Sequence, residues 1–471
     1  MSASSYRPTI GLEIHAELST RTKMFCDSRN DPEELDVNVN ICPICLAHPG
    51  TLPTINKEAV RHVLRVGSAV GGTLADYTEF DRKSYFYPDI PKGYQISQYE
   101  HPLVSGGTLN GVAITRVHLE EDTARSSHAG GASLVDFNRA GIPLMELVTE
   151  PVIKDAKAAG DFARELQLLL RTLGASKANL EKGEMRIEVN ISVSKNDTFG
   201  TKVEIKNLNS FRSVERAIAY EIERQAALLE EGGTVVQETR GWDEGKQATF
   251  RQRSKEGSAD YRYFPEPDLP KMIRSEIPEF SDDTLRAGLP ELPDVTRARY
   301  RELGVKSEDI ELYLQNEFLR TLFDAVVERA EGDKELITLA GNYVISDIAG
   351  MQSDTAGSEK LTPEHFVALM RMTKEGTISS RGAKDLLAVM YVEGGEPRVL
   401  AEAKGLLQVS DPEALQSLVQ GVLTEHPGPV AEYRSGKESS IQFLVGQAMK
   451  ASKGAGNPGV LREMLEKELK K

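Results

Sequence analysis

The clearest pattern in the chain is a strict alternation of apolar and polar residues in short segments of its first half. In residues 10–18, apolar side chains alternate with polar ones that include Glu13 and His15. Residues 185–193 and 201–206 alternate in the same way. Successive side chains of a strand point to opposite faces, so this pattern predicts half-buried strands of the antiparallel type.

Between these strands, apolar residues recur at helical spacing. Residues 161–173 follow this spacing and are followed by Gly174, a residue type that favours a helix C-terminus. Residues 213–229 form a second such segment, before Gly232 and Gly233. The mixture predicts an α+β fold, built mainly on an antiparallel sheet.

The pattern changes around residues 264–296, where prolines crowd the chain and almost wholly helical sequence follows. Prolines interrupt both sheets and helices, so this stretch is a predicted boundary. A second break is predicted near 394–397, where glycines precede a proline. A chain of 471 residues exceeds one ordinary core. We therefore expect three domains: a sheet domain (1–293), a helical domain (294–400) and a small helical tail domain (401–471).

Composition and charge narrow the class of protein. No segment approaches 18 consecutive apolar residues, and the first residues lack the basic and apolar regions of a secretion signal. We expect a cytoplasmic protein without a membrane partner. The net charge of −15 disfavours a broad nucleic-acid-binding surface, so any RNA site must be local.

Acidic side chains on the polar faces of the predicted strands are the first candidates for chemistry. Glu13 and His15 share one strand face, and Glu188 and Glu204 stand centrally on two others. Clustered carboxylates repel one another unless a cation neutralises them, and Mg²⁺ prefers oxygen ligands. Such a site suits phosphoryl transfer. The alternative is a set of ordinary solvated strand faces.

A charged segment follows at Arg116–Asp122, which contains a histidine and three carboxylates. Alternation places Glu120 with the polar side chains and Glu121 with the apolar ones. A carboxylate on the apolar side needs a partner or a metal. The alternative is a solvated turn.

The segment 80–95 combines basic and aromatic residues. Arg82 and Lys83 are candidates for contacts with phosphates, and Tyr85 is a candidate for the same nucleotide site. Ordinary loop packing is the alternative. The chain contains no G-x-x-x-x-G-K-[ST] motif, so ATP would not bind through a P-loop.

Cys42 and Cys45 form a C-x-x-C motif, with Cys26 upstream. The three cysteines argue against a disulfide framework. They do not suffice for a four-cysteine zinc site.

Several long blocks together identify a resemblance. They are IGLEIHAEL, CPICLAHPGTLPTIN, FDRKSYFYPDIPKGYQISQ, ITRVHLEEDTARSSH, SLVDFNRAGIPLMELVTEP, EIKNLNSFRSVERAI and GSADYRYFPEPDLP. In this order they resemble the B subunits of aspartyl/glutamyl-tRNA amidotransferases, the GatB family. The C-terminal residues resemble the YqeY-like tail domain of that family, so the likeness covers nearly the whole chain.

The resemblance implies a cradle domain, a helical domain and a tail domain that binds tRNA. It implies an enzyme that uses ATP and Mg²⁺ to phosphorylate the side-chain carboxylate of misacylated Glu-tRNA(Gln) or Asp-tRNA(Asn). Ammonia from a glutamine-hydrolysing amidase A subunit then displaces the phosphate. A small C subunit is a further implied partner, as is the cognate aminoacyl-tRNA synthetase.

The resemblance also implies roles for individual residues. Glu13, His15, Glu121 and Glu204 match acidic and histidine positions of the family's metal site, with Glu188 as a further ligand. Lys206 is a candidate phosphate contact from its position alone. Many relatives have a fourth cysteine where Ser28 stands, so Cys26, Cys42 and Cys45 are expected to form a vestigial zinc site. The rival hypothesis is a non-catalytic scaffold that binds tRNA, and a free-standing small-molecule kinase is disfavoured by the helical tail.

Overall fold

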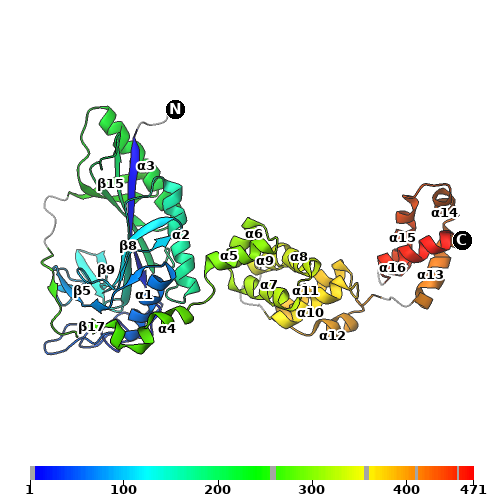
Figure 1. The fold of residues 1–471 in the computed structure, drawn as a ribbon, viewed down its shortest axis with the longest axis horizontal. Helices are drawn as coiled ribbons and strands as arrows, with labels where there is room; N and C mark the ends of the chain where they lie inside the picture. The colour runs from blue at the N-terminus through cyan, green and yellow to red at the C-terminus, as the bar shows by residue number, and fades with distance from the viewer. Residues whose placement is uncertain (1–5, 255–260, 355–359, 409–411, 453–455, 471) are drawn as a thin grey trace. The chain divides into compact units, whose positions relative to one another are not determined.

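A computed structural model describes residues 6–254, 261–354, 360–408, 412–452 and 456–470 (Figure 1). Residues 257–260, which begin one of the blocks quoted above, lie outside this range. Contacts divide the chain into two compact units, Met1–Pro293 and Asp294–Lys471. No helix in the described ranges is both long and apolar enough to cross a membrane.

The first unit is built on one large mixed sheet, and the fold is α+β as predicted. In spatial order the strands are β15 (Ala248–Ser254), β14 (Glu238–Asp243), β13 (Val203–Leu208), β12 (Met185–Ser194), β1 (Arg7–Glu17), β11 (Pro143–Thr149), β8 (Val112–Glu121), β6 (Val104–Ser105) and β2 (Thr73–Leu74), with β7 (Thr108–Leu109) beside β8. All neighbouring pairs are antiparallel except β13 with β14. The three strands predicted from alternation are β1, β12 and β13.

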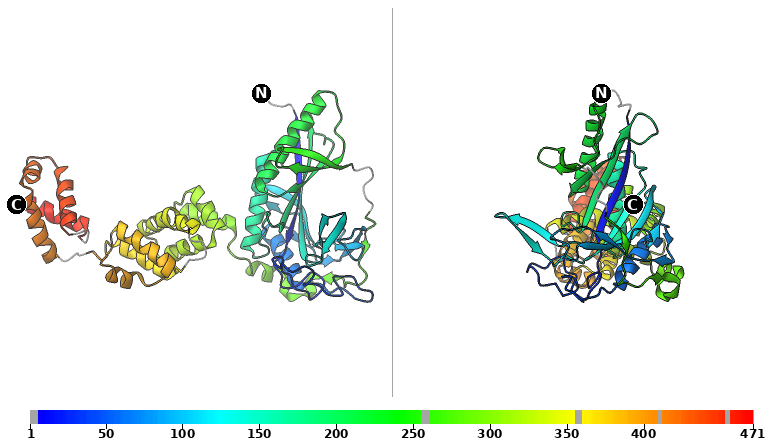
Figure 2. Two further views of the ribbon diagram at one scale, coloured as in Figure 1. Left: turned by 180° about the vertical axis from the view of Figure 1, so that it is seen from behind. Right: turned by 90° about the vertical axis from the view of Figure 1, so that its left-hand side faces the viewer.

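Helices cover one face of this sheet (Figures 1 and 2). They are α1 (Lys57–Ala69), α2 (Ala156–Thr172) and α3 (Phe211–Glu230), with the short α4 (Asp282–Ala287) against α1. Their apolar residues and the inward side chains of the strands form one continuous core. The second helix begins before the predicted residue 161, because Asp155 caps it by accepting the backbone N–H of Ala158. The small residues that follow the cap carry little apolar signal.

Smaller sheets border the large one. They are β16 (Phe264–Pro265) with β4 (Asp81–Ser84) and β5 (Tyr94–Ser97), the hairpin β9 (Arg125–Ala129) with β10 (Ala132–Asp136), and β3 (Tyr77–Thr78) with β17 (Met272–Ile273). Two 3₁₀ turns, Arg274–Glu276 and Pro278–Phe280, precede α4. The sheet of β16, β4 and β5 matters for function because it brings residues 81–84 and 261–266 together.

The second unit is helical within its described residues, as predicted, apart from an isolated β-bridge between Ile378 and Leu407. Its first helices are α5 (Pro293–Glu302), α6 (Ser307–Gln315), α7 (Glu317–Arg329), α8 (Lys334–Tyr343), a π-helical turn (Val344–Ile348), α9 (Ala349–Asp354), α10 (Pro363–Lys374), α11 (Ser380–Glu393) and α12 (Pro397–Ala403). The last are α13 (Pro412–Glu425), α14 (Pro427–Arg434), α15 (Ser440–Ala451) and α16 (Pro458–Leu469), which share an apolar core of their own. Gly394 ends α11 with φ 77°, yet α12 beyond it still packs against α10 and α11.

Candidate active site

The face of the large sheet opposite the helices carries a row of charged side chains. Along β1, Leu12 and Ile14 are buried in the core that the helices cover, so the intervening Glu13 and His15 point to the other face. Strand pairing places Glu13 opposite Glu188 of β12, and His15 opposite Glu146 of β11. The polar side chains of neighbouring strands therefore lie side by side, and together they form one acidic strip across the sheet.

One end of the strip is a group of three carboxylates. Oxygen atoms of Glu13, Glu188 and Glu204 all lie within 4.8 Å of one another. The amide of Asn190 donates a hydrogen bond of 2.8 Å to Glu13, and the hydroxyl of Thr239 donates one of 2.7 Å to Glu204. These bonds fix the orientations of two of the three carboxylates.

Lys206 supplies positive charge to this group. Its ammonium lies 2.8 Å from Glu188 and 3.5 Å from Glu204. The register between β12 and β13 shifts between Ile187 and Val189, opposite Lys206, and the adjacent Asn207 has a left-handed φ of 62°. Such bulges redirect side chains. Burial alone would lower the pKa of Lys206, but Glu188 and Glu204 raise it overall, so the ammonium stays charged.

The second group in the strip consists of His15, Glu120 and Glu146. The Nε2 atom of His15 lies 3.3 Å from Glu120 and 3.7 Å from Glu146. His118 of β8 also contacts this group, with its Nε2 atom 3.1 Å from Glu146. Because β1 carries both Glu13 and His15, the two groups are neighbours on one surface.

The electrostatics of this second group favour its charged forms. Burial would lower the pKa of His15, but Glu120, Glu146 and Glu188 raise it to about 9. Burial would likewise raise the pKa of Glu146, yet the nearby His118 and His15 hold it well below its usual range. Without a bound cation, these charges favour Glu146 as the carboxylate and His15 as the imidazolium. As a metal ligand, His15 would bind through its neutral imidazole.

Glu121 does not lie with His15, which corrects the predicted site. Its carboxylate lies 2.7 Å from the ammonium of Lys92 and accepts the backbone N–H of Ile96 at 2.9 Å. Neighbouring residues of a strand point to opposite faces, so only Glu120 can reach the acidic strip. The buried carboxylate of Glu121 is thus compensated by a lysine and a backbone amide.

The residues of β4 that were predicted to contact the nucleotide also point to opposite faces of their strand. Lys83 faces the strip, where Glu120 and Glu146 outweigh burial and raise its pKa. Arg82 points away and forms a bidentate pair with the buried Glu266, at 2.7 and 2.8 Å. Glu266 already engages the guanidinium and gives Arg82 a structural partner, and the phosphate contact of Arg82 stays a prediction. Tyr85 continues on the side of Lys83 and packs edge-on against Tyr261.

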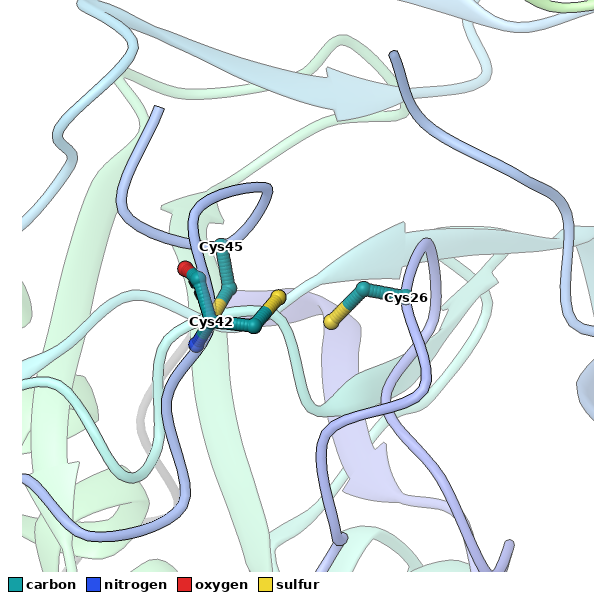
Figure 3. Close-up of side chains that lie close together, drawn as sticks. All are labelled: Cys26, Cys42 and Cys45. Carbon is teal, nitrogen blue, oxygen red and sulfur yellow. Dashed lines mark hydrogen bonds between the residues drawn. The ribbon is translucent and has the colours of Figure 1, made fainter. Parts of the chain in front are cut away.

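The cysteines lie together (Figure 3). Cys26 and Cys45 also line a separate cavity of about 270 Å³. The sulfur atoms of Cys26, Cys42 and Cys45 are all within 4.8 Å of one another. The hydroxyl of Ser28 and the ammonium of the buried Lys23 each lie 3.8 Å from the sulfur of Cys45. A hydrogen bond from Cys26, aided by Lys23, lowers the pKa of Cys45 to about 4. Ser28 and Lys23 therefore both lie next to the cysteine cluster, on the side of Cys45.

Comparison with known protein families assigns the chain. Residues 8–277 match the GatB/GatE catalytic domain, and residues 321–469 match the GatB domain. The chain belongs to the GatB family, the B subunits of tRNA-dependent amidotransferases. The predicted resemblance is confirmed.

Three GatB relatives show how far the similarity extends. The B subunit of the chloroplastic/mitochondrial glutamyl-tRNA(Gln) amidotransferase from Physcomitrium patens is 43% identical, over 99% of this chain and 86% of its own. The B subunits of the aspartyl/glutamyl-tRNA(Asn/Gln) amidotransferases from Synechocystis and Persephonella marina are each 41% identical, over 99% of this chain and 98% and 100% of theirs. The likeness therefore spans both units of the chain.

The donor atoms of the acidic strip are suited to divalent cations. Glu13, Glu188 and Glu204 bring three carboxylates together beside the one ammonium of Lys206. That leaves an excess of negative charge and supplies hard oxygen ligands, which Mg²⁺ prefers over nitrogen or sulfur. The residues present fit such an ion.

The sequence analysis missed Glu146 and His118 as members of the strip. Glu146 interrupts the buried apolar strand β11, between Met145 and Leu147. A lone carboxylate in such a strand must have a partner, and this signal could have identified it. His118 was noted only as part of a charged segment, because its partner Glu146 is distant in the sequence.

Proposed function

We propose that this GatB protein uses ATP and Mg²⁺ to phosphorylate the side-chain carboxylate of a misacylated Glu-tRNA(Gln) or Asp-tRNA(Asn). The single observation that carries the proposal is the acidic strip, in which two groups of potential metal ligands adjoin on one sheet face. A scaffold has no use for so many carboxylates in one place, since like charges this close repel one another.

The proposed chemistry begins with a poor electrophile, the substrate carboxylate. One carboxylate oxygen attacks the γ-phosphorus of ATP, the bond from phosphorus to the bridging oxygen breaks, and ADP leaves. Ammonia then attacks the carbonyl carbon of the acyl phosphate, the carbon–oxygen bond breaks, and inorganic phosphate leaves with formation of the amide. Bound Mg²⁺ would neutralise the charge that develops on the phosphoryl oxygens.

The chain's own cations have definite places in this scheme. The ammonium of Lys83 faces Glu120 and Glu146, where it can hold an anionic group of the substrate near the acidic strip. Lys206 lies at the other end, paired with Glu188 at 2.8 Å. Preorganised charges of this kind stabilise a transition state more than flexible ones do, because they need no reorganisation during the reaction.

The partner chains are part of the same proposal. The relatives are named as B subunits, which implies a complex of several chains. We infer an amidase A subunit that supplies ammonia from glutamine and a small C subunit. The tail core of α13–α16 is the part we assign to tRNA binding, and the cognate aminoacyl-tRNA synthetase is a further inferred partner.

The test is release of ADP by the reconstituted complex when ATP and each misacylated tRNA are supplied separately. We expect release that depends on the misacylated tRNA and is lost in Glu204→Gln. Use of each tRNA identifies the substrate. Unchanged ADP release in Glu204→Gln, with intact tRNA binding, would favour the scaffold hypothesis, in which the chemistry belongs to a partner.

A further inference from the structure

A ladder of aromatic rings leads from the acidic strip to the protein surface. Tyr85 packs edge-on against Tyr261, whose ring centroid is 6.5 Å away. Tyr261 packs edge-on against Tyr263 at 6.1 Å. Tyr263 in turn stacks face to face with Tyr99, with centroids 4.3 Å apart and planes inclined by 13°. Of these three contacts, only the last brings the ring planes nearly parallel.

The inner end of the ladder belongs to the candidate active site. The ammonium of Lys83 lies 4.9 Å from the centroid of the Tyr261 ring. Burial raises the pKa of Tyr263 to about 12, and Glu120 and Glu146 add to this rise. These interactions place Tyr261 and Tyr263 within electrostatic reach of the second group of the strip.

The outer end of the ladder is open to solvent. Tyr99 remains 55% exposed although one face of its ring lies on Tyr263. A second stacked pair in the protein provides a contrast. Tyr313 and Phe323 stack at 4.6 Å and 17°, but both are buried in the helical core, at 0% and 1% exposure. Core packing explains that pair and leaves the exposed ring of Tyr99 unexplained.

The position of Tyr99 is fixed by backbone hydrogen bonds. The N–H of Tyr99 donates to the carboxylate of Asp81 in β4, at 2.8 Å. The N–H of Ser84, in the same strand, donates to the carbonyl of Tyr261 at 2.9 Å. The pair of Arg82 with Glu266 is a second tie between β4 and the segment that carries Tyr261 and Tyr263. Rings held in this way lose little conformational freedom when a ligand stacks on them.

We propose that Tyr99, supported by Tyr263, is a stacking platform for the adenine base of a substrate of the phosphorylation reaction. This inference rests on the proposed function, because both of its substrates carry adenine, ATP in its nucleoside and the tRNA in its terminal adenosine. Every nucleobase presents a π-face, and a purine offers the larger one. Exposed, rigid aromatic rings are a usual means of stacking on such bases.

The experiment uses the full-length chain in two binding assays and compares Tyr99→Ala with Tyr99→Phe. The first assay titrates the non-hydrolysable analogue adenosine 5′-(β,γ-imido)triphosphate by calorimetry. The second compares uncharged tRNA with the same tRNA lacking its terminal adenosine. Phe199→Ala is the matched control, since Phe199 is 72% exposed and we assign it no ligand contact.

We expect Tyr99→Ala to weaken binding by about fivefold to a hundredfold in one of the two assays, the range for stacking of a single base. Tyr99→Phe and Phe199→Ala should bind like the unaltered protein. If Tyr99→Ala weakens binding of the ATP analogue, the platform binds the adenine of ATP. If instead Tyr99→Ala no longer distinguishes the intact tRNA from the tRNA without its terminal adenosine, the platform binds the adenine of the tRNA. Unchanged binding of Tyr99→Ala in both assays would overturn the proposal. Neither assay requires turnover, so failure of phosphorylation itself would be seen separately.

Discussion

Glu120 and Glu121 are adjacent in β8, but their carboxylates have different partners on opposite faces of the strand. Glu120 lies 3.3 Å from His15 in the acidic strip, and Glu121 lies 2.7 Å from Lys92 beside the cysteine cavity. The geometry thereby gives the two carboxylates different surroundings, although the sequence presents them as a single acidic pair.

The first prediction separates these two carboxylates by activity. Replacing Glu120 or Glu204 by Gln removes charge from the proposed metal site. We expect tRNA-dependent ADP release to fall by about 10²- to 10³-fold, as when a preorganised electrostatic group is lost. Glu121→Gln should retain most of this release, since its carboxylate faces Lys92. Equal losses in Glu120→Gln and Glu121→Gln would contradict the separation.

The second prediction concerns the pair that joins β16 to β4. Arg82→Ala leaves the carboxylate of Glu266, whose side chain has 0% exposure, without its bidentate partner. We expect the free energy of unfolding to decrease by about 3–5 kcal/mol, the usual effect of breaking a buried pair. Chemical denaturation measures this change. Arg7→Ala, which breaks an exposed pair with Asp197, is the control and should change stability by less than about 1 kcal/mol. A similar, small effect in both variants would show that Arg82 is not a structural residue.

The third prediction concerns the tail. The helices α13–α16 have their own apolar core, so a chain that ends before residue 412 should keep a folded first unit. We expect this truncated chain to assemble with its partner chains and to lose affinity for tRNA. Gel-shift titration of the assembled complex measures the affinity. Undiminished tRNA binding would exclude the tail as an RNA-binding element.

The fourth prediction concerns the cysteine cluster. Three sulfur atoms converge, and the neighbouring Ser28 offers only a hydroxyl, a poor zinc ligand beside thiolates. We expect less than one zinc ion per chain in protein purified without chelator, measured by elemental analysis. Ser28→Cys should raise both zinc content and melting temperature without altering ADP release. Stoichiometric zinc in the unaltered protein would contradict a vestigial site.

Much of the site could be predicted from local alternation, because one face of a strand is read directly from every second residue. Glu13, His15, Glu188 and Glu204 were identified in this way, and the structure brings the three carboxylates within 4.8 Å of one another. Lys206 was proposed from position alone, and a bulge directs it to Glu188. Local periodicity also predicted the three strands that carry these residues, β1, β12 and β13.

What could not be predicted are the relationships between distant strands. The contact of His118 with Glu146 depends on the pairing of β8 with β11, and the pair of Arg82 with Glu266 joins residues 184 positions apart. Family resemblance assigned Glu121 where alternation favoured Glu120. The structure agrees with alternation, because side-chain direction in a strand is fixed by the backbone.

The acidic strip consists entirely of strand residues, drawn from β1, β8, β11, β12 and β13. A shift of one residue in the pairing of β12 would turn Glu188 toward the helices and expose Val189 in its place. Loops can open and close locally, but a strand in a sheet cannot rotate one side chain outward alone. Loss of the site should therefore coincide with cooperative unfolding of the sheet, so that in this protein a thermal inactivation curve and a thermal unfolding curve should have a common midpoint.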